Sequence, residues 1–501
     1  MTKWCSILAV AVFVVLGWAA VTMGGLNQDE GWYLYAANLI AEGKLPYRDF
    51  FFTQGPVMPI VYSAFTGIWN GWGLAGARAF TLSIGAFGIV FAMALARRMT
   101  TPDRRNEVSA IVFLLLGCNL YHLYYLTIPK TYALAALFVL VGFYLLSFTL
   151  SRLSWLFCLG AGLCLAFAAG TRISLGFLLP VAGIWLLVRR RWIAFAWFCL
   201  GGCAGLLLVY LPFLVDNRAC EGLFAAQRYH AMRGGFDITW VVGSFSRLVR
   251  WYLPVFVAAG LGCFRKAWVL FAGFLVVFAV QMLAPFPYED YQVPVMALLA
   301  VFAAVNLVAI ATGKMPVAPG TGFATGETPV APEDNRTVEK SKILLLVLGM
   351  CFACSFGSPL LEKWSTNGQD RFWSLKKEKY ELRQLQDVAR EIEALDPGGK
   401  DLLTQDLYLA IETGRKVPEG LEMGPFAMLS ERDWEQLLDS APCRMAALSA
   451  YSFAVNPPVC DERPLDKQMK FWNIVMRHYN LEIKEDNFGQ NATPLLVLKR
   501  K

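Results

Sequence analysis

Long apolar runs separated by short polar connections dominate the first two thirds of the chain. Most runs approach the roughly 20 residues that a helix needs to cross a bilayer. The first run has no small-residue cleavage site followed by a soluble chain, so we interpret it as a retained helix rather than a signal peptide. We predict about eleven spanning helices, at 4–23, 74–96, 108–126, 132–150, 155–171, 173–188, 193–214, 251–264, 267–285, 293–311 and 343–359.

Every second connection between these runs is basic, with arginine or lysine at 97–105, 152, 189–191, 265–266 and 340–342. Basic residues are enriched in cytoplasmic connections of membrane proteins. A cytoplasmic N-terminus places all of these connections inside, and an odd number of spans then places the C-terminus outside. We therefore expect a multi-pass protein of the inner (plasma) membrane with this orientation.

The composition becomes that of a soluble domain after residue 360. The expected organisation is a membrane region over 1–311, a disordered cytoplasmic linker over 312–342, a last span over 343–359 and an extracytoplasmic α/β domain over 360–501. An outer location would permit a disulfide between Cys443 and Cys460. Within this domain we expect helices at 371–395, from Ser430 and at 464–479, and strands at 401–404, 446–453 and 494–498.

Composition excludes several function classes. Hydrophobic residues make up 56% of the chain and charged residues 17%, against about 25% charged in soluble proteins. The net charge of +7 is accounted for by topology, and no nucleic-acid motif accompanies it. The cysteines have no metal-ligand spacing. Because the spans carry few ionisable residues, unlike those of many transporters, we expect the site at the outer membrane face.

The first outer connection is the most informative segment. Asp29 and Glu30 follow the first span directly, and an amphipathic stretch then carries Trp32, Tyr35 and Leu39 on one face. We expect this stretch to form a helix that lies flat at the membrane interface with its aromatic residues at headgroup depth. The paired carboxylates fit a general base and its neighbour. They also fit a helix N-terminus, where acidic residues favour the helix dipole.

A span that ends in Asp-Glu, a tyrosine-rich helix and a proline-containing loop resemble the membrane glycosyltransferases of the GT-C fold. The closest resemblance is to glycosyltransferase family 39, with the protein O-mannosyltransferases and the bacterial aminoarabinose transferases of lipid A. It is most specific over 27–60, extends as topology to about 311, and includes 401–424 of the outer domain. Gly55-Pro56 departs from the Lys-Pro-Pro of many relatives.

The resemblance implies transfer of a sugar from a polyprenyl-phosphate donor to an acceptor hydroxyl, with inversion. It assigns Asp29 as the base, and Glu30 as the residue that orients Asp29 or binds the sugar. Arg172 stands where relatives often carry a lysine and suits a phosphate, although a headgroup anchor is the alternative. Lys130 is a weaker candidate. The expected substrate-binding residues are Tyr33, Tyr47, Asp49, Gln54, Arg172, Arg228, Arg233, Glu289 and Asp290.

Several alternatives stay open at this point. Arg228 and Arg233 fit contact with anionic lipid equally well, and Glu289 and Asp290 fit a solvated turn. A divalent metal at the acidic loop is compatible with the residues but not required, so no cofactor is expected. The expected partners are the lipid-linked donor, a glycan, lipid or protein acceptor, and membrane lipids. A flippase for lipid-linked saccharides and a non-enzymatic envelope scaffold are the competing functions.

Overall fold

The protein is described from a computed structural model. The structure describes residues 3–232, 235–260, 267–310, 380–426, 443–449, 475–490 and 493–501, with a few further positions at 347–354, 436–437 and 472–473. The predicted linker at 312–342, most of the predicted span at 343–359, and the predicted helix start at Ser430 lie outside the described residues.

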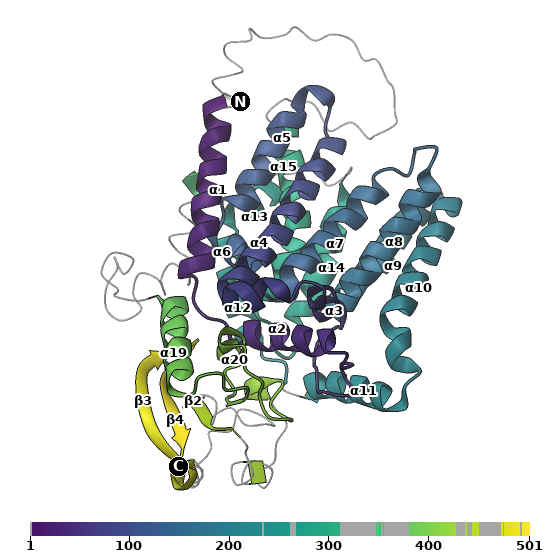
Figure 1. The fold of residues 1–501 in the computed structure, drawn as a ribbon. Helices are drawn as coiled ribbons and strands as arrows, with labels where there is room; N and C mark the ends of the chain where they lie inside the picture. The colour runs from purple at the N-terminus through teal and green to yellow at the C-terminus, as the bar shows by residue number, and fades with distance from the viewer. Residues whose placement is uncertain are drawn as a thin grey trace, which may run out of the picture.

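A bundle of helices forms the larger part of the molecule, and all described strands lie beyond one of its ends (Figure 1). The first run of sequence folds as α1 (Lys3–Met23), and the connection that follows contains two helices before the next long one. The helices are α1 (Lys3–Met23), α2 (Gln28–Ala41), α3 (Val57–Ser63), α4 (Gly67–Arg98), α5 (Arg105–Gly117), α6 (Leu120–Thr127), α7 (Thr131–Leu146), α8 (Ser154–Thr171), α9 (Leu178–Val188), α10 (Trp192–Leu214), α11 (Asn217–Met232), α12 (Ile238–Trp251), α13 (Leu253–Gly260), α14 (Trp268–Met282) and α15 (Val293–Ile310).

The helices confirm the expected polytopic membrane fold. Among the described residues, 4 helices are long and apolar enough to cross a membrane, or up to 6 if each bent helix pair is one span. The expected number of about eleven is larger because several predicted spans are shorter apolar helices, at Thr131–Leu146, Ile173–Val188 and Trp268–Met282. The number of spans stays a prediction.

The first predicted span continues into a sharply bent second helix, and the predicted span at 108–126 is itself divided by a bend. The axis turns by 83° between α1 and α2, and by 70° between α5 and α6. In α4 the backbone is kinked at Trp72 and Gly73, where Gly73 has φ 60°. An added Cβ at Gly73 would lie 2.4 Å from the Glu412 carboxylate, so this position requires glycine for both its conformation and its space.

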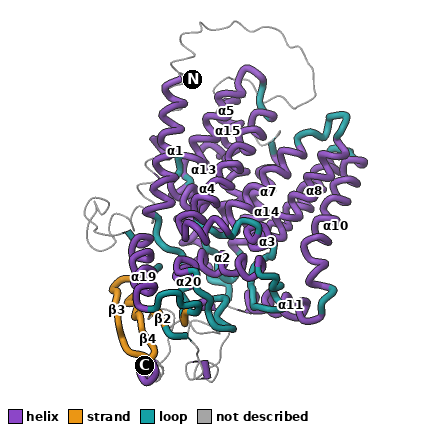
Figure 2. Tube along the Cα trace, viewed as in Figure 1, coloured by secondary structure: helices purple, strands orange, loops and turns teal. Residues whose placement is uncertain are grey.

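The C-terminal domain, by which we mean the described part of 380–501, packs a sheet and two helices together (Figure 2). Its sheet has the strand order β1-β2-β4-β3. Strands β1 and β2 are parallel, whereas β4 is antiparallel to both β2 and β3. The elements are α19 (Glu381–Leu395), β1 (Leu402–Leu403), α20 (Leu407–Thr413), β2 (Met445–Ser449), β3 (Tyr479–Phe488) and β4 (Thr493–Arg500).

Sequence reasoning located three of these strands and α19, but it missed β3 and α20. Tyr479, expected as the end of a helix, is the first residue of β3. Most of that predicted helix lies outside the described residues, as does Cys460. Cys443 is buried, and the predicted disulfide between the two stays a prediction.

The domain lies at the end of the bundle where α1 turns into α2, whereas the N-terminus lies at the opposite end (Figure 1). Two of the predicted inner connections meet at one place, because Arg98 at the end of α4 donates to the Ser147 hydroxyl at the end of α7, at 2.7 Å. This contact agrees with the predicted alternation of the connections. Which side faces the cytoplasm stays a prediction.

Candidate active site

The carboxylate predicted as a base lies in the first turn of α2. Asn27 caps this helix, and its side chain accepts a hydrogen bond from the Asp29 amide at 3.1 Å. The Glu30 carboxylate accepts a hydrogen bond from the Asn27 amide at 2.9 Å, which completes a capping box. Asp29 is therefore fixed at a helix N-terminus, where the unpaired amides and the helix dipole favour a negative charge.

Both oxygens of the Asp29 carboxylate have defined partners. Oδ1 accepts from the Trp32 indole at 3.0 Å, one turn further along α2. Oδ2 lies 2.7 Å from the Lys130 ammonium. The Asp29 side chain still keeps 24% of its surface exposed, so it is held in place but accessible to a substrate.

Lys130 joins Asp29 to a second carboxylate. Its Nζ lies 3.3 Å from Oδ2 of Asp290, and the same oxygen accepts from the Tyr132 hydroxyl at 2.6 Å. Burial lowers the pKa of Lys130, but the charges of Asp29 and Asp290 outweigh burial and raise the pKa well above its ordinary value. The ammonium is therefore charged at every physiological pH and supplies the positive charge between the two carboxylates.

Arg172 is held beside Lys130 by aromatic rings. Its guanidinium lies 4.2 Å from the ring centroid of Tyr291 and 5.1 Å from that of Tyr132, and it donates weakly to Thr131 at 3.4 Å. Lys130 lies 5.0 Å from the same Tyr132 ring. Within the part of the chain that the structure describes, Arg172 forms no ion pair with a carboxylate. A guanidinium fixed in this way is suited to an anionic ligand.

The site brings together four connections that are distant in the sequence. Asp29 comes from the start of α2, Lys130 from the turn before α7, Arg172 from the end of α8 and Asp290 from the turn before α15. All four belong to connections predicted on the outer side of the membrane. Their convergence agrees with that prediction, because residues on opposite sides of a bilayer could not be in contact.

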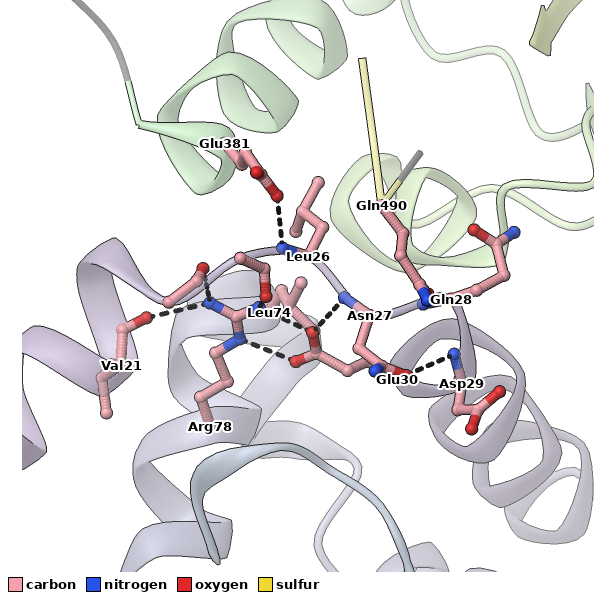
Figure 3. Close-up of polar contacts among 12 residues, drawn as sticks. Val21, Leu26, Asn27, Gln28, Asp29, Glu30, Leu74, Arg78, Glu381 and Gln490 are labelled. Carbon is pink, nitrogen blue, oxygen red and sulfur yellow. Dashed lines mark hydrogen bonds and ion pairs between the residues drawn. The ribbon is translucent and has the colours of Figure 1, made fainter. Parts of the chain in front are cut away.

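Glu30 has a different environment from its neighbour. Its carboxylate forms two hydrogen bonds with Arg78, at 2.6 and 2.7 Å, and neither side chain has any exposed surface. Arg78 also donates to the carbonyls of Gly24 and Gly25 in the bend between α1 and α2. Figure 3 shows Glu30 directed toward Arg78 and Asp29 directed away from it. This geometry favours the role of orienting Asp29 over sugar binding.

The aromatic face of α2 is buried in the protein. The prediction that these aromatic residues lie among the lipid headgroups is therefore wrong. Trp32, Tyr35 and Leu39 are at most 5% exposed. The helix itself is confirmed, but it packs between the membrane helices and α20 (Figure 1). Tyr33 is also buried, and its ring stacks on that of Trp32.

Three other predicted residues hold the first connection in shape. The Tyr47 hydroxyl donates to the Gln54 carbonyl, and the Tyr47 ring packs edge-on against Phe213. Asp49 accepts from the Leu45 amide at 2.7 Å. The loop then reaches Gly55, where an added Cβ would lie 2.1 Å from the Gly170 carbonyl oxygen. This close approach joins the loop to the segment that carries Arg172.

Two further predicted residues, Glu289 and Arg228, have other contacts than those around Asp29. Glu289 pairs with Arg247 of α12 at 3.1 Å. Arg228 is exposed on α11, which contacts the first connection through Tyr229 and Phe51. Arg233 lies outside the described residues.

Sequence reasoning named Tyr33 but missed Tyr132, which contacts both cations. Tyr132 opens the apolar run predicted as a span at 132–150, so no polar signal marks it. A single lysine in a short turn is a weak signal, and Lys130 is therefore only a weaker candidate from the sequence. Among the described residues, no group of three or more His, Cys, Asp and Glu side chains is arranged to hold a metal ion.

Solved structures of similar fold were found, although no family model and no curated protein matches the chain. The chain is similar to ArnT from Cupriavidus metallidurans bound to undecaprenyl phosphate, with a TM-score of 0.60, 15% identity, and coverage of 99% of this chain and 98% of that one. The apo state of that protein gives a TM-score of 0.59 and 16% identity over the same shares of the two chains.

The chain has the GT-C fold. An oligosaccharyltransferase from Archaeoglobus fulgidus, in complex with Zn and sulfate, also matches, with a TM-score of 0.50, 12% identity, and coverage of 96% of this chain and 72% of that one. At these identities the likeness establishes the fold, which is the one expected from the sequence. The match to ArnT spans the membrane helices and the C-terminal domain together.

Proposed function

We propose that this protein is an inverting glycosyltransferase that moves a sugar from a polyprenyl-phosphate donor to an acceptor hydroxyl at the outer membrane face. One observation carries the proposal: Arg172 lies against two tyrosine rings and forms no ion pair with a carboxylate of the described residues, beside the linked Asp29, Lys130 and Asp290. The arrangement offers a cationic place for a phosphate next to a partly exposed carboxylate. Undecaprenyl phosphate bound to a protein of the same fold supports this assignment.

The reaction follows from these positions. The lipid tail of the donor stays among the membrane helices, and its phosphate lies against Arg172 and Lys130. Lys130 then exchanges one carboxylate for the phosphate, which frees Oδ2 of Asp29. The acceptor hydroxyl attacks the anomeric carbon and gives its proton to Asp29. The bond from that carbon to the phosphate oxygen breaks, and the polyprenyl phosphate leaves with its charge balanced by the two cations.

Asp290 and Tyr132 have supporting roles in this proposal. Asp290 pairs with Lys130 and accepts a hydrogen bond from Tyr132, and Tyr132 also presents its ring to Arg172. Glu30 holds the first turn of α2 through Arg78 and touches no reacting atom. Because Arg172 and Lys130 together balance the charge of the leaving phosphate, the proposed reaction needs no divalent ion, and we expect activity to persist with a chelator present.

The test is consumption of a labelled polyprenyl-phosphate sugar by the protein in vesicles with an envelope extract. We expect Asp29→Asn to reduce turnover by about 10²–10⁴-fold, the usual contribution of a general base. Arg172→Gln should raise the donor KM. Asp486→Asn, an exposed aspartate paired with Lys484, is the matched control and should behave as wild type.

Two outcomes would contradict the proposal. Full activity of a folded Asp29→Asn protein would remove Asp29 as the base. If the wild type consumes no donor but carries the intact lipid-linked sugar across the vesicle membrane, the flippase function replaces the transferase.

A further inference from the structure

The C-terminal domain binds the start of α2, the helix that carries Asp29, through hydrogen bonds and close packing. The backbone amides of Leu26 and Gln28 lie at the bend before α2 and in its first turn, where a helix has no internal acceptors for them. Leu26 donates to the Glu381 carboxylate at 2.6 Å, and Gln28 donates to the Gln490 side chain at 2.7 Å. Figure 3 shows both acceptors reaching this bend from the C-terminal domain.

The Gln28 side chain makes further contacts with the C-terminal domain. Its amide nitrogen donates to the Asp406 carboxylate at 3.2 Å and to the Gln405 carbonyl at 3.3 Å, and all three side chains are buried. Tyr408 donates to the same Asp406 oxygen. These contacts are side chain to backbone as well as side chain to side chain, so they fix the path of the chain itself.

A backbone contact fixes α2 on the other side of Asp29. Gly31 lies directly against the start of α20, where an added Cβ would be 2.2 Å from the Tyr408 amide nitrogen and 2.6 Å from the Leu407 carbonyl carbon. Both neighbours are backbone atoms and cannot turn away. Glycine at this position lets the two helices approach more closely than any side chain permits.

We infer that the C-terminal domain is a positioning element of the active site, which sets the place of the Asp29 carboxylate through Glu381, Gln490 and the Gly31 contact. This inference rests on the proposed function. Asp29 stands between the two attachment points, one residue after Gln28 and two before Gly31. The domain therefore determines the tilt and height of the first turn of α2, and with it the distance from the carboxylate to an acceptor hydroxyl.

The consequence is a specific kinetic signature. A misplacement of about 1 Å of a catalytic group costs about 100-fold in rate. The donor phosphate contacts Arg172 and Lys130. Neither residue is contacted by Glu381, Gln490 or the start of α20, so donor binding should be kept. We expect Gln490→Leu, which is similar in size but has no acceptor, to reduce kcat by about tenfold or more with less than a threefold change in donor KM. Gln490→Glu retains an acceptor oxygen and should recover most of the activity.

The experiment compares these two variants with Gly31→Ala and with Lys416→Met in vesicles. Lys416 pairs with Glu42 beyond the end of α2, with 61% and 42% of the two side chains exposed. Its variant therefore removes an interdomain contact far from Asp29 and should leave kcat unchanged. Hydrogen exchange of the amides at 26–31 gives a second readout, and exchange should increase in Gln490→Leu and not in Lys416→Met.

The outcomes separate this inference from the proposed function. A wild type that consumes no donor overturns the proposed function, and the inference falls with it. An active wild type with an equally active Gln490→Leu, in which exchange at 26–31 has increased, overturns the positioning role alone. A loss of kcat that Gln490→Glu does not recover, or that Lys416→Met reproduces, would indicate general destabilisation and would also overturn it.

Discussion

Glu30 and Arg78 are the most deeply buried ion pair at the bend between α1 and α2. Both side chains are fully buried, and Arg78 also satisfies carbonyls of the bend. Removing one partner of such a pair leaves an uncompensated charge away from water. The pair therefore determines whether the first turn of α2 forms at the right place.

We predict that Glu30→Gln destabilises the folded protein by about 3–5 kcal/mol, the usual cost of breaking a buried pair. Thermal unfolding in lipid nanodiscs measures this effect. In a double-mutant cycle, Arg78→Met added to Glu30→Gln should cost much less than the sum of the single variants. A Glu30→Gln protein of unchanged stability but without turnover would instead place Glu30 in the chemistry.

The sequence is informative about single residues only where a local pattern marks them. Asp29 stands where the first span emerges, and the resemblance over 27–60 assigns it as the base. Tyr132 contacts both cations of the site, but it stands at the start of an apolar run and resembles any span residue. Arg78 stands near the start of the predicted span at 74–96, and its partner Glu30 is 48 positions away in the sequence. Pairing between distant residues has no local signal.

At the scale of elements, the connection at 55 and the end of α8 are packed backbone against backbone. An added Cβ at Gly55 would lie 2.1 Å from the Gly170 oxygen and 2.7 Å from its carbonyl carbon. Gly170 is followed closely by Arg172, so any relaxation of this contact moves the guanidinium. Packing of the loop and placement of the cation are therefore linked.

We predict that Gly55→Ala destabilises the protein by about 1–3 kcal/mol, as overpacking does elsewhere, and raises the donor KM because Arg172 is displaced. Thermal unfolding and donor kinetics measure the two effects. Gly71→Ala is the matched control, since an added Cβ there meets nothing within 4 Å. Unchanged stability and KM in Gly55→Ala would contradict the proposed link.

The contact between α20 and α4 should respond to pH. Glu412 accepts from the Leu74 amide at 2.8 Å, just after the kink in α4. Burial raises the pKa of Glu412, and the hydrogen bond from Leu74 opposes this only in part. A carboxyl group with a raised folded-state pKa binds its proton more tightly in the folded protein. Stability is therefore lost as the pH rises from the unfolded-state pKa through the folded-state pKa.

We predict that Glu412→Gln removes the loss of folding stability that Glu412 causes as the pH rises. The melting temperature of the variant relative to wild type should increase steadily between about pH 4.3, the ordinary pKa of a glutamate, and neutral pH. Differential scanning across this range measures it. Glu419→Gln, at an exposed position, is the matched control. A Glu412→Gln difference that falls toward neutral pH would mean that the ionised carboxylate stabilises the contact.

Element positions were predictable from the sequence to a large extent, and element directions were not. Apolar length located the membrane helices, since it reflects the bilayer itself. The bends after α1 and α5 depend on tertiary contacts such as the Glu30–Arg78 pair. Strand β3 carries many charged residues, which hid the alternation of Leu481 and Ile483. The short helix α20 is recognisable mainly by Gly414, which ends it in a left-handed conformation.

The whole molecule has two different ends. The C-terminal domain lies beyond one end of the bundle, together with the four connections that build the site. The N-terminus lies at the other end (Figure 1). Arg98, in the predicted basic connection at 97–105, contacts Ser147 at the end of α7, which leads into the predicted basic connection at 152. The sequence pattern and the contacts thus agree on which connections share a side. Charge alone assigns that side to the cytoplasm or to the exterior.

We predict that the C-terminal domain and the site face the exterior, because the basic connections should stay in the cytoplasm. Alkaline phosphatase fused after Lys501 needs an oxidising compartment and should be active in a bacterial host, whereas a fluorescent protein fused there should stay dark. A short tag inserted after Arg190, in the exposed turn between α9 and α10, should be protected from protease in intact cells. If the C-terminal fluorescent fusion is bright and the tag after Arg190 is cleaved, the orientation is the opposite of the predicted one. A donor whose sugar is exposed on the outer face could then no longer reach Asp29.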